Sequence, residues 1–252
     1  MKKVLYLSIL IITVIFSCTK DGGEVSGVSV DNNGSGKAGS MAKFSINGNH
    51  LFLINEHDLK IYDITNEDNP QLLTSTRLDF GIETVFSLGD YLYIGSSRGM
   101  YIYDISNASN IKYMSFYQHI TSCDPVVAND SLAFVTLNTG RTCNWEWGED
   151  RFDVLDISDK LNPVRIYSGV TGTPLGLGLN DHYVFICKGI GVSYYDFSNP
   201  HQVNYVGAIS GVSAYDMIIQ NDIMYLIGKD GLFQYQISDI NNIILISNIL
   251  FN

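Results

Sequence analysis

The segment Trp145-Glu146-Trp147 combines aromatic and acidic side chains in a pattern that suits ligand recognition. It holds both tryptophans of the 252-residue chain. An indole ring can stack on a sugar ring or dock into a partner protein, because it joins a large apolar face to one polar N–H group. The alternative is that the two rings only cover a small core of their own loop. Trp145, Glu146 and Trp147 are therefore candidate ligand-binding residues.

Three acidic residues, Glu83, Asp124 and Asp216, occupy similar places in a repeating pattern. Counting back six residues from a recurring turn Asp or Asn gives Lys43, Thr84, Asp124, Leu175 and Asp216, and Glu83 precedes Thr84. If these positions line one channel, the carboxylates could bind a cation or a polar ligand, with Lys43 as the counter-charge. The alternative is a solvated polar channel with a structural salt bridge. Glu83, Asp124 and Asp216 are the second set of candidate ligand-binding residues.

The four cysteines have separate expected roles. Cys123 and Cys143 lie 20 positions apart. In an oxidising compartment they could form a disulfide, which would contribute roughly 3 kcal/mol through loop closure. Cys187 lies in the apolar run 183–187, which predicts a buried free thiol. No C-x-x-C pair is present, so the spacing favours neither a zinc ribbon nor a thioredoxin-like site.

No compact catalytic or metal-binding motif accompanies these residues. The five histidines are scattered and form no H-E-x-x-H pattern. A nucleophile elbow, a Walker loop and a dinucleotide-binding glycine pattern are also absent from the sequence. A fold can still bring distant residues together into a catalytic triad, so an enzyme stays an alternative. We assign no catalytic residue, no metal site and no cofactor from the sequence.

Five similar units position the candidate residues. The recurring motif reads Ile61-Tyr62-Asp63-Ile64-Thr65, Ile102-Tyr103-Asp104-Ile105-Ser106, Val154-Leu155-Asp156-Ile157-Ser158, Tyr194-Tyr195-Asp196-Phe197-Ser198 and Gln234-Tyr235-Gln236-Ile237-Ser238. The third residues lie 41, 52, 40 and 40 positions apart, and a polar turn beside a short apolar strand precedes each motif. Units of this length with four short strands are typical of β-propeller blades. The sequence predicts an all-β fold, a single β-propeller of five four-stranded antiparallel blades over residues 41–252. Ring closure would remove free sheet edges, and the unit boundaries leave exchange of a closing strand open.

The aspartates of this motif could be interpreted as ligands of a calcium ion. Calcium needs six to eight oxygens around one centre, whereas equivalent positions of successive blades are spread around a ring. We therefore predict that each aspartate caps the turn after its strand. The third unit is longer than the others by about eleven residues near 139–150, and this insertion holds the tryptophan pair. Such insertions often form the binding surface of a repeat protein.

The first eighteen residues read as an export signal. Lys2 and Lys3 precede an apolar run, 4–16, which is shorter than the roughly 20 residues of a membrane span. Ile15-Phe16-Ser17-Cys18 resembles a bacterial lipobox, which implies removal of 1–17 and lipidation of Cys18. Thr19, in place of Asp, implies sorting to the outer membrane. Lys20-Asp21 and Glu24 resemble the charged export tag of surface lipoproteins, so cell-surface and periplasmic orientations both stay open. Residues 18–40 are expected to form a flexible, Gly- and Ser-rich tether.

The motif with its following Asn or Pro resembles the LVIVD-repeat family of β-propeller-like proteins. Three further stretches resemble Bacteroidetes lipoproteins of that family: Gly81-Ile82-Glu83-Thr84, Ser122-Cys123-Asp124-Pro125-Val126-Val127 and Asp230-Gly231-Leu232-Phe233-Gln234-Tyr235. The resemblance covers nearly all of residues 41–252 and implies a secreted or surface propeller. It carries over no catalytic residue. Gln236 departs from the repeat aspartate, which weakens the case for one chemical role shared by this position in all five units.

Composition and charge narrow the function. The chain is 46% hydrophobic, enough for a full core, and its net charge of −11 argues against nucleic acid, which needs a clustered basic face. We expect an outer-membrane-tethered, non-catalytic binding module for an envelope protein or a glycan, met by the face that bears Trp145. One alternative is a carbohydrate-active or other extracytoplasmic enzyme with an acidic site at the channel mouth, which would need paired carboxylates about 5–10 Å apart. Another alternative is a structural scaffold in an envelope complex.

Overall fold

The computed structural model describes residues 39–55, 57–78, 81–119, 125–139 and 149–251. The chain divides into two units, Met1–Asp31 and Asn32–Asn252, and every described residue belongs to the second. Within the described residues, no helix has the length and apolar character of a membrane span. The predicted signal peptide and Cys18 lie outside the described residues.

The described residues form twenty strands and no α-helix. In chain order the strands are β1 (Phe44–Asn47), β2 (His50–Ile54), β3 (Asp58–Asp63), β4 (Gln71–Arg77), β5 (Ile82–Leu88), β6 (Tyr91–Ser96), β7 (Gly99–Asp104), β8 (Lys112–Gln118), β9 (Val126–Ala128), β10 (Leu132–Leu137), β11 (Arg151–Asp156), β12 (Val164–Val170), β13 (Leu177–Asn180), β14 (Tyr183–Cys187), β15 (Gly191–Asp196), β16 (Asn204–Ser210), β17 (Asp216–Gln220), β18 (Ile223–Ile227), β19 (Gly231–Gln236) and β20 (Ile244–Leu250).

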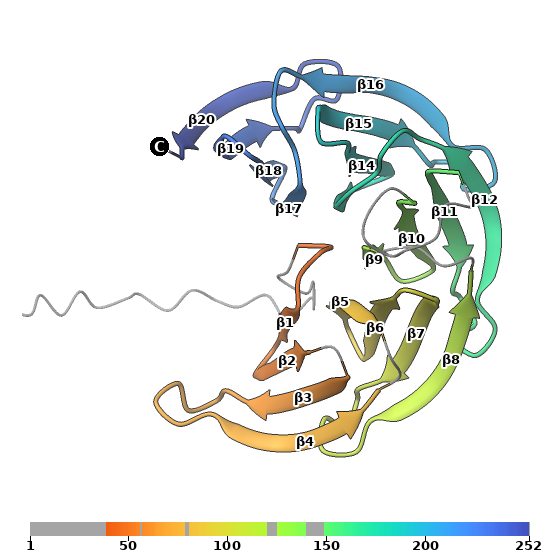
Figure 1. The fold of residues 1–252 in the computed structure, drawn as a ribbon, viewed down its shortest axis with the longest axis vertical. Coiled ribbons are helices and arrows are strands. Elements are labelled where there is room, and N and C mark those ends of the chain that lie inside the picture. The colour runs from red at the N-terminus through yellow and green to blue at the C-terminus, as the bar shows by residue number, and fades with distance from the viewer. Residues whose placement is uncertain (1–38, 56, 79–80, 120–124, 140–148, 252) are drawn as a thin grey trace, which may run out of the picture. The chain divides into compact units, whose positions relative to one another are not determined.

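Each run of four consecutive strands makes one antiparallel sheet, and the five sheets are the blades of a β-propeller (Figure 1). Blade 1 is β1–β4, blade 2 is β5–β8, blade 3 is β9–β12, blade 4 is β13–β16 and blade 5 is β17–β20. The first strand of each blade lies nearest the centre and the fourth lies at the rim (Figure 1). The predicted fold class, with five four-stranded antiparallel blades, is confirmed.

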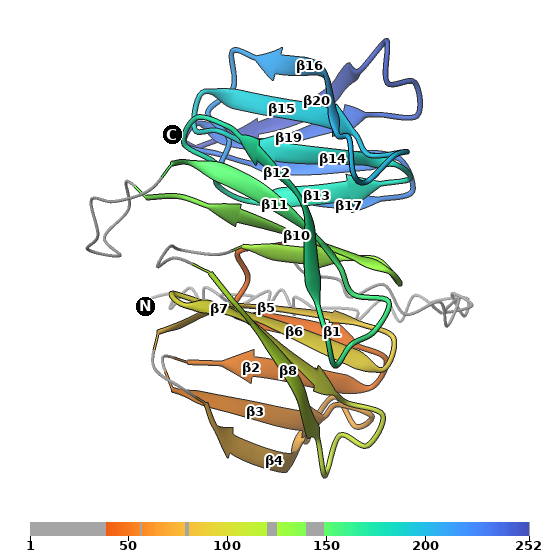
Figure 2. The ribbon, with the colours of Figure 1, turned by 90° about the vertical axis from the view of Figure 1, so that its right-hand side faces the viewer.

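One β-bulge recurs in all five blades, between the third and fourth strands. In blade 4 the register shifts between Tyr194 and Tyr195, inside the repeated motif, and the other four blades shift at the matching place. A bulge adds right-handed twist to the strands that it joins. Accordingly, Figure 2 shows the outer strands β8 and β12 crossing the inner strands of their blades steeply. The motif thus sets the blade twist as well as the repeat.

The motif aspartates cap the turns that follow their strands, as predicted. Asp104 accepts hydrogen bonds from Ser106 N at 2.9 Å and Ser106 Oγ at 2.6 Å. Asp63, Asp156 and Asp196 accept the backbone N–H two residues later in the same way. These hydrogen bonds lower the pKa of all four aspartates, because they stabilise the ionised carboxylate.

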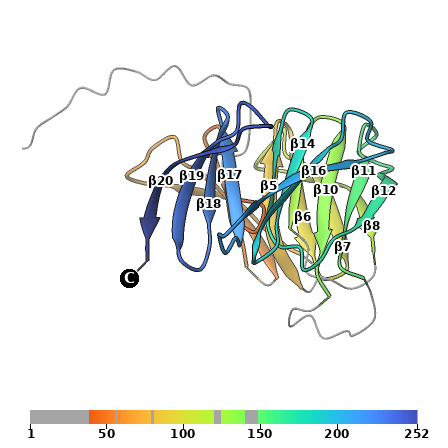
Figure 3. The same cartoon turned by 90° about the horizontal axis from the view of Figure 1, so that it is seen from above.

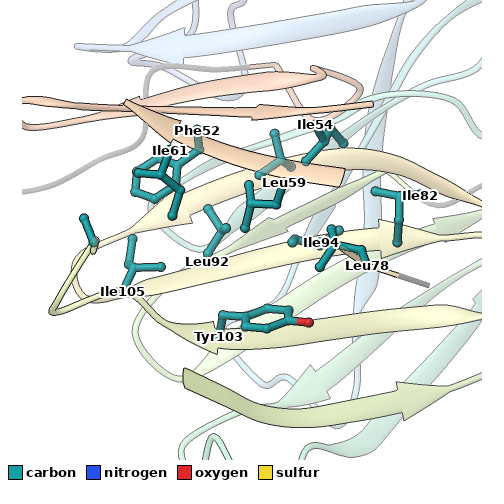
Figure 4. Packing of buried hydrophobic residues seen from close by; sticks show 12 residues of the cluster. Phe52, Ile54, Leu59, Ile61, Leu78, Ile82, Leu92, Ile94, Tyr103 and Ile105 are labelled. Carbon is teal, nitrogen blue, oxygen red and sulfur yellow. The ribbon is translucent and has the colours of Figure 1, made fainter. Parts of the chain in front are cut away.

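Apolar side chains between neighbouring blades make the core. Phe52 and Leu59 of blade 1 pack with Leu92 and Ile94 of blade 2, and all four are almost fully buried (Figure 4). Comparable clusters lie between blades 2 and 3, blades 3 and 4, and blades 4 and 5. Each pair of successive blades from 1 to 5 therefore shares one apolar interface.

Blades 5 and 1, the two ends of the row, share no comparable interface. Strands of successive blades pack extensively from blade 1 through to blade 5, but no strand of blade 5 packs in this way on a described strand of blade 1. Figure 1 shows a gap between the ribbons of β17–β20 and β1–β4, which we call the opening, and Figure 3 shows β20 at the margin of the fold. No described strand is exchanged between blades. The packing expected between neighbouring blades is therefore absent between the described strands of these two blades. The outer strand of every blade, β20 included, keeps a free edge.

Candidate functional site

Asp216, predicted to line a ligand site, instead binds the chain's own residues at the centre of the propeller. Its Oδ1 accepts a hydrogen bond from Ser40 Oγ at 2.8 Å, and its Oδ2 accepts one from Met41 N at 3.1 Å. Ser40 Oγ in turn accepts the N–H of Leu177 at 2.7 Å. Burial raises the pKa of Asp216, and the hydrogen bonds from Met41 and Ser40 oppose that rise. Asp216 therefore acts as a clasp that holds Ser40 and Met41 against blades 4 and 5.

The clasp extends the packed part of the chain into the region expected to be tether. Ser40 is fully buried, although it lies within the predicted 18–40 tether. Gly39 is buried as well, and a Cβ there would collide with the Asp216 carboxylate. A Cβ at Gly176 would collide with the same carboxylate. The two glycines thus allow the backbone to approach Asp216 closely on both sides.

The other channel residues do not join Asp216 in a described acidic site. Glu83 lies at a bulge in β5 between Ile82 and Thr84 and is partly exposed. Lys43 is exposed, and Asp124 lies outside the described residues. Among the described residues, no cluster of three or more His, Cys, Asp or Glu side chains could hold a metal ion. The three-carboxylate ligand site stays a prediction.

The strand ladders correct the counting that grouped the channel residues. Asn180 is the last residue of β13 and pairs with Tyr183, so it belongs to the strand and not to the turn. Gln220 pairs with Ile223 in the same way, which makes Gly176 the blade 4 equivalent of Asp216. Leu175, one residue earlier, is buried in the core between blades 4 and 5. The counting was wrong by one residue there, and in a strand one residue reverses the side on which a side chain lies.

A cavity of about 160 Å³ lies among the inner strands β5, β9, β13 and β17. The residues that line it have apolar side chains or none and include Phe86, Ala128, Gly178 and Ile218, but no residue of blade 1. The channel expected to be polar is therefore apolar at this level. A dry apolar cavity of roughly 150 Å³ accepts benzene-sized groups, so this one has room for one large apolar side chain.

The base of the long loop is well defined, although its tip is not described. Asp150 Oδ1 accepts Thr139 N and Thr139 Oγ1, both at 2.9 Å, and Oδ2 accepts Thr173 N at 2.8 Å. Asn138 Nδ2 donates to the Pro174 carbonyl oxygen at 2.9 Å. These bonds anchor both ends of the insertion to the segment that leads into blade 4. Trp145, Glu146 and Trp147, and the predicted disulfide of Cys123 and Cys143, lie outside the described residues and stay predictions.

Sequence reasoning missed a buried ion cluster beside this loop. Asp153 is fully buried, and its Oδ1 lies 3.2 Å from Arg151 Nε and accepts Ser168 Oγ at 2.7 Å. Arg165 reaches Asp153 Oδ2 at 3.7 Å. The sequence signal for this cluster was the charged residue at 153. The matching strand positions in the other blades are uncharged or partly exposed. The cluster fixes β11, the strand that leaves the insertion, against β12.

Cys187 is buried and free, as predicted. Burial raises the pKa of its thiol well above the ordinary value, and the nearby Asp216 charge adds to that rise. A neutral, inaccessible thiol is a poor nucleophile and metal ligand. Cys187 is therefore a packing residue of blade 4.

The face of blade 5 that points away from blade 4 is apolar and exposed. We define this forward flank by Ile218, Ile227 and Ile249, whose exposed fractions are 40%, 43% and 62%. The ladders match Ile227 and Ile249 to Cys187 and Ile209 of blade 4. In blade 4 both of those residues pack in the core formed with blade 5. The forward flank of blade 5 thus carries the apolar residues of a blade interface, although no described blade packs on it.

Blade 1 has the complementary bare face. We define this backward flank by Phe44, Ile46 and Leu53, with exposed fractions of 51%, 37% and 39%. The ladders match Phe44 and Leu53 to Met217 and Leu226 of blade 5, which are only 2% and 0% exposed against blade 4. The two flanks therefore face one opening, whose inner end is held by the contacts of Ser40 with Asp216.

These features define the class of protein as a β-propeller in which no described blade covers the apolar interface surface between blades 5 and 1. The family model for the LVIVD repeat matches residues 84–119, which are nearly the whole of blade 2. The other four units carry the same motif on the same four-stranded blade. The chain therefore contains an LVIVD repeat within a β-propeller, and the predicted resemblance to LVIVD-repeat β-propellers is confirmed.

Solved structures support the fold. A functionally unknown protein from Desulfotomaculum acetoxidans matches with a TM-score of 0.64 and 8% identity, over 86% of this chain and 70% of that one. A hypothetical selenium-binding protein from Sulfolobus tokodaii has a TM-score of 0.60 and 13% identity, over 81% and 59%. The periplasmic gluconolactonase of Pseudomonas aeruginosa has a TM-score of 0.62 and 10% identity, over 81% and 68%. At these identities the likeness concerns the fold, and this chain spans between 59% and 70% of the three lengths. No curated protein matches the chain.

Proposed function

We propose that this chain is a lipid-anchored β-propeller of the outer membrane that binds a protein partner through the forward and backward flanks. The observation that supports this proposal is a difference in exposure between equivalent residues. Residues on the flanks are exposed, whereas residues at the same positions in the internal interfaces are packed. Ile249 is 62% exposed, whereas its blade 4 equivalent, Ile209, packs against blade 5. Burying exposed apolar surface is the main favourable term in protein association.

The membrane location in this proposal rests on the sequence. The apolar run 4–16 and the lipobox-like Ile15-Phe16-Ser17-Cys18 support export and lipidation of Cys18. The Gly- and Ser-rich residues that follow would act as a spacer of roughly 25 Å between the membrane and the propeller. A protein held in this way meets partners in the envelope or at the cell surface.

The alternatives to a protein-binding role receive less support. An acidic catalytic site would need Glu83 and Asp216 to face one pocket with free carboxylates. Both oxygens of Asp216 already accept hydrogen bonds from Ser40 and Met41. Glycan binding by Trp145 and Trp147 stays a separate possibility of the long loop, and a scaffold role differs from the proposal only in what the partner does.

Photo-crosslinking in cells tests the proposal. A benzophenone amino acid is placed at Ile249 or at Leu53, one position on each flank, and at Tyr205 as a matched control. Tyr205 lies on the outer strand of blade 4 and is 62% exposed, the same fraction as Ile249. We expect a crosslinked protein adduct from both flank positions and none from Tyr205.

Two outcomes would count against this function. An absence of adducts from both flanks, or equal adducts from Tyr205, would show that the flanks are not a specific binding surface. The same crosslinking in a Trp145→Ala/Trp147→Ala double variant locates the site further. Flank adducts that disappear in that variant would move the main binding surface to the long loop.

A further inference from the structure

The proposed function leaves open what kind of protein surface fills the opening. We propose that the opening receives a further four-stranded β-propeller blade, carried by a partner polypeptide. This inference rests on the proposed function and specifies the chemistry of the partner. The partner blade packs one apolar face on the forward flank of blade 5 and its other apolar face on the backward flank of blade 1.

The first argument is continuity with an interface that the chain already forms four times. At each internal interface, the forward face of one blade packs on the backward face of the next. Between blades 4 and 5, Cys187 and Val192 on one side meet Met217 and Leu226 on the other. The forward flank repeats the first pattern and the backward flank repeats the second. A surface that complements both flanks together must be apolar on two faces, which is the property of a blade.

The second argument is the amount of apolar surface. The two flanks expose six large apolar side chains between 37% and 62%. At about 100 Å² for each half-exposed side chain, they offer roughly 600 Å², which is a large share of the about 800 Å² per partner in a standard stable interface. The residues concerned are Phe44, Ile46, Leu53, Ile218, Ile227 and Ile249.

The third argument is the cavity among the inner strands β5, β9, β13 and β17. Ile218 of the forward flank lines it, and no residue of blade 1 does. An apolar side chain from the innermost strand of an incoming blade would fill this space of about 160 Å³. Buried anchors of this kind, seated in a pocket near the centre of an interface, carry much of the binding energy in protein complexes.

The experiment supplies a blade of known sequence to the full chain. A second copy of residues 41–119, the chain's own first two blades, is added after Asn252, so that a backward flank becomes available to blade 5. The probe is the rate of maleimide labelling of an Ile249→Cys variant, measured on the labelled peptide by mass spectrometry. We expect the added blades to slow this labelling at least tenfold. Labelling of a Tyr205→Cys variant should not change.

A matched extension separates specific packing from simple crowding. It carries the same added residues with Asp in place of the copied Phe44 and Leu53, the two residues that would face the forward flank. With this extension, labelling of Ile249→Cys should stay as fast as in the unextended chain. Equal labelling rates with both extensions would overturn the proposal.

Two further results distinguish the proposed blade from other occupants of the opening. If labelling of the unextended chain slows as its concentration rises, and light scattering shows a dimer, the occupant is a second copy and the proposal fails. If flank crosslinks form in cells but the added blades give no protection, the partner is not a blade. In that case the binding function stands and only this inference falls.

Discussion

At the scale of single residues, Asp216 shows that a buried carboxylate can have a structural role in place of a ligand-binding one. An acidic residue near a channel suggests a cation or a polar ligand, yet both oxygens of Asp216 accept hydrogen bonds from the chain's own residues 40 and 41. Ser40 is equally informative, because a serine in a Gly- and Ser-rich segment gives no sequence signal of burial. Its hydroxyl both donates to Asp216 and accepts the N–H of Leu177.

Replacement of Ser40 tests the clasp. A Ser40→Ala variant removes the donor to Asp216 and leaves the buried N–H of Leu177 without its partner. Leaving a buried polar group unsatisfied costs about 1–3 kcal/mol, so the free energy of unfolding in urea should fall by that amount. The control is Ser75→Ala on the exposed outer strand β4, which should change it by less than about 0.5 kcal/mol. Equal small effects would mean that the clasp does not hold the folded state together.

At the scale of elements, the repeated motif performs several local tasks. Its aspartate caps a turn in four blades, and the bulge within it recurs in all five. Blade 5 keeps its fold with Gln236 in place of the aspartate, so the cap is helpful but not required. What differs between blades is the neighbour that covers each face, and this changes the role of matching residues.

Two matching isoleucines on outer strands test that difference. Ile209 of β16 packs with the core shared by blades 4 and 5, whereas Ile249 of β20 is 62% exposed. An Ile209→Asp variant should lose about 2–4 kcal/mol of stability, because it brings an unpaired charge into an apolar interface. An Ile249→Asp variant of the isolated chain should lose less than about 0.5 kcal/mol. Urea unfolding measures both, and similar large losses would mean that the forward flank is already covered in solution.

At the scale of the whole molecule, the bare flanks make this propeller dependent on what covers them. The segment 243–251 carries no charged residue, and its strand β20 is exposed on both sides. Uncharged apolar strands with a free edge readily pair with other chains. A specific partner in the opening would cover the forward flank of blade 5, whereas an empty opening would leave that apolar surface exposed to other chains.

The membrane anchor is tested at this scale as well. A Cys18→Ser variant should lose incorporation of labelled palmitate and should leave the outer-membrane fraction, because a lipobox requires the cysteine. Cys187→Ser serves as the control, since Cys187 is a buried thiol within the propeller. That variant should keep both the label and the membrane location. Membrane location that survives in Cys18→Ser without the label would contradict the lipid anchor.

The sequence by itself determined the features that depend on nearby residues. Strand alternation, turn aspartates and a period of about 40 residues specify blades through local contacts, so the all-β propeller and its turn caps were predictable. The buried thiol of Cys187 was predictable for the same reason, because it lies within an apolar strand. Strand register was predictable only to within one residue, as the shift from Leu175 to Gly176 shows.

Only the tertiary structure decided which surfaces are covered. Leu53 and Leu226 are the same residue type at matching positions, yet one is 39% exposed and the other is 0% exposed. No local pattern distinguishes them, because burial depends on whether another blade follows in space. The same holds for the bond of Ser40 to Asp216, which joins residues 176 positions apart. Contacts at that separation arise only when five blades curve around one centre, so the candidate binding surface of this protein is a property of the assembled ring.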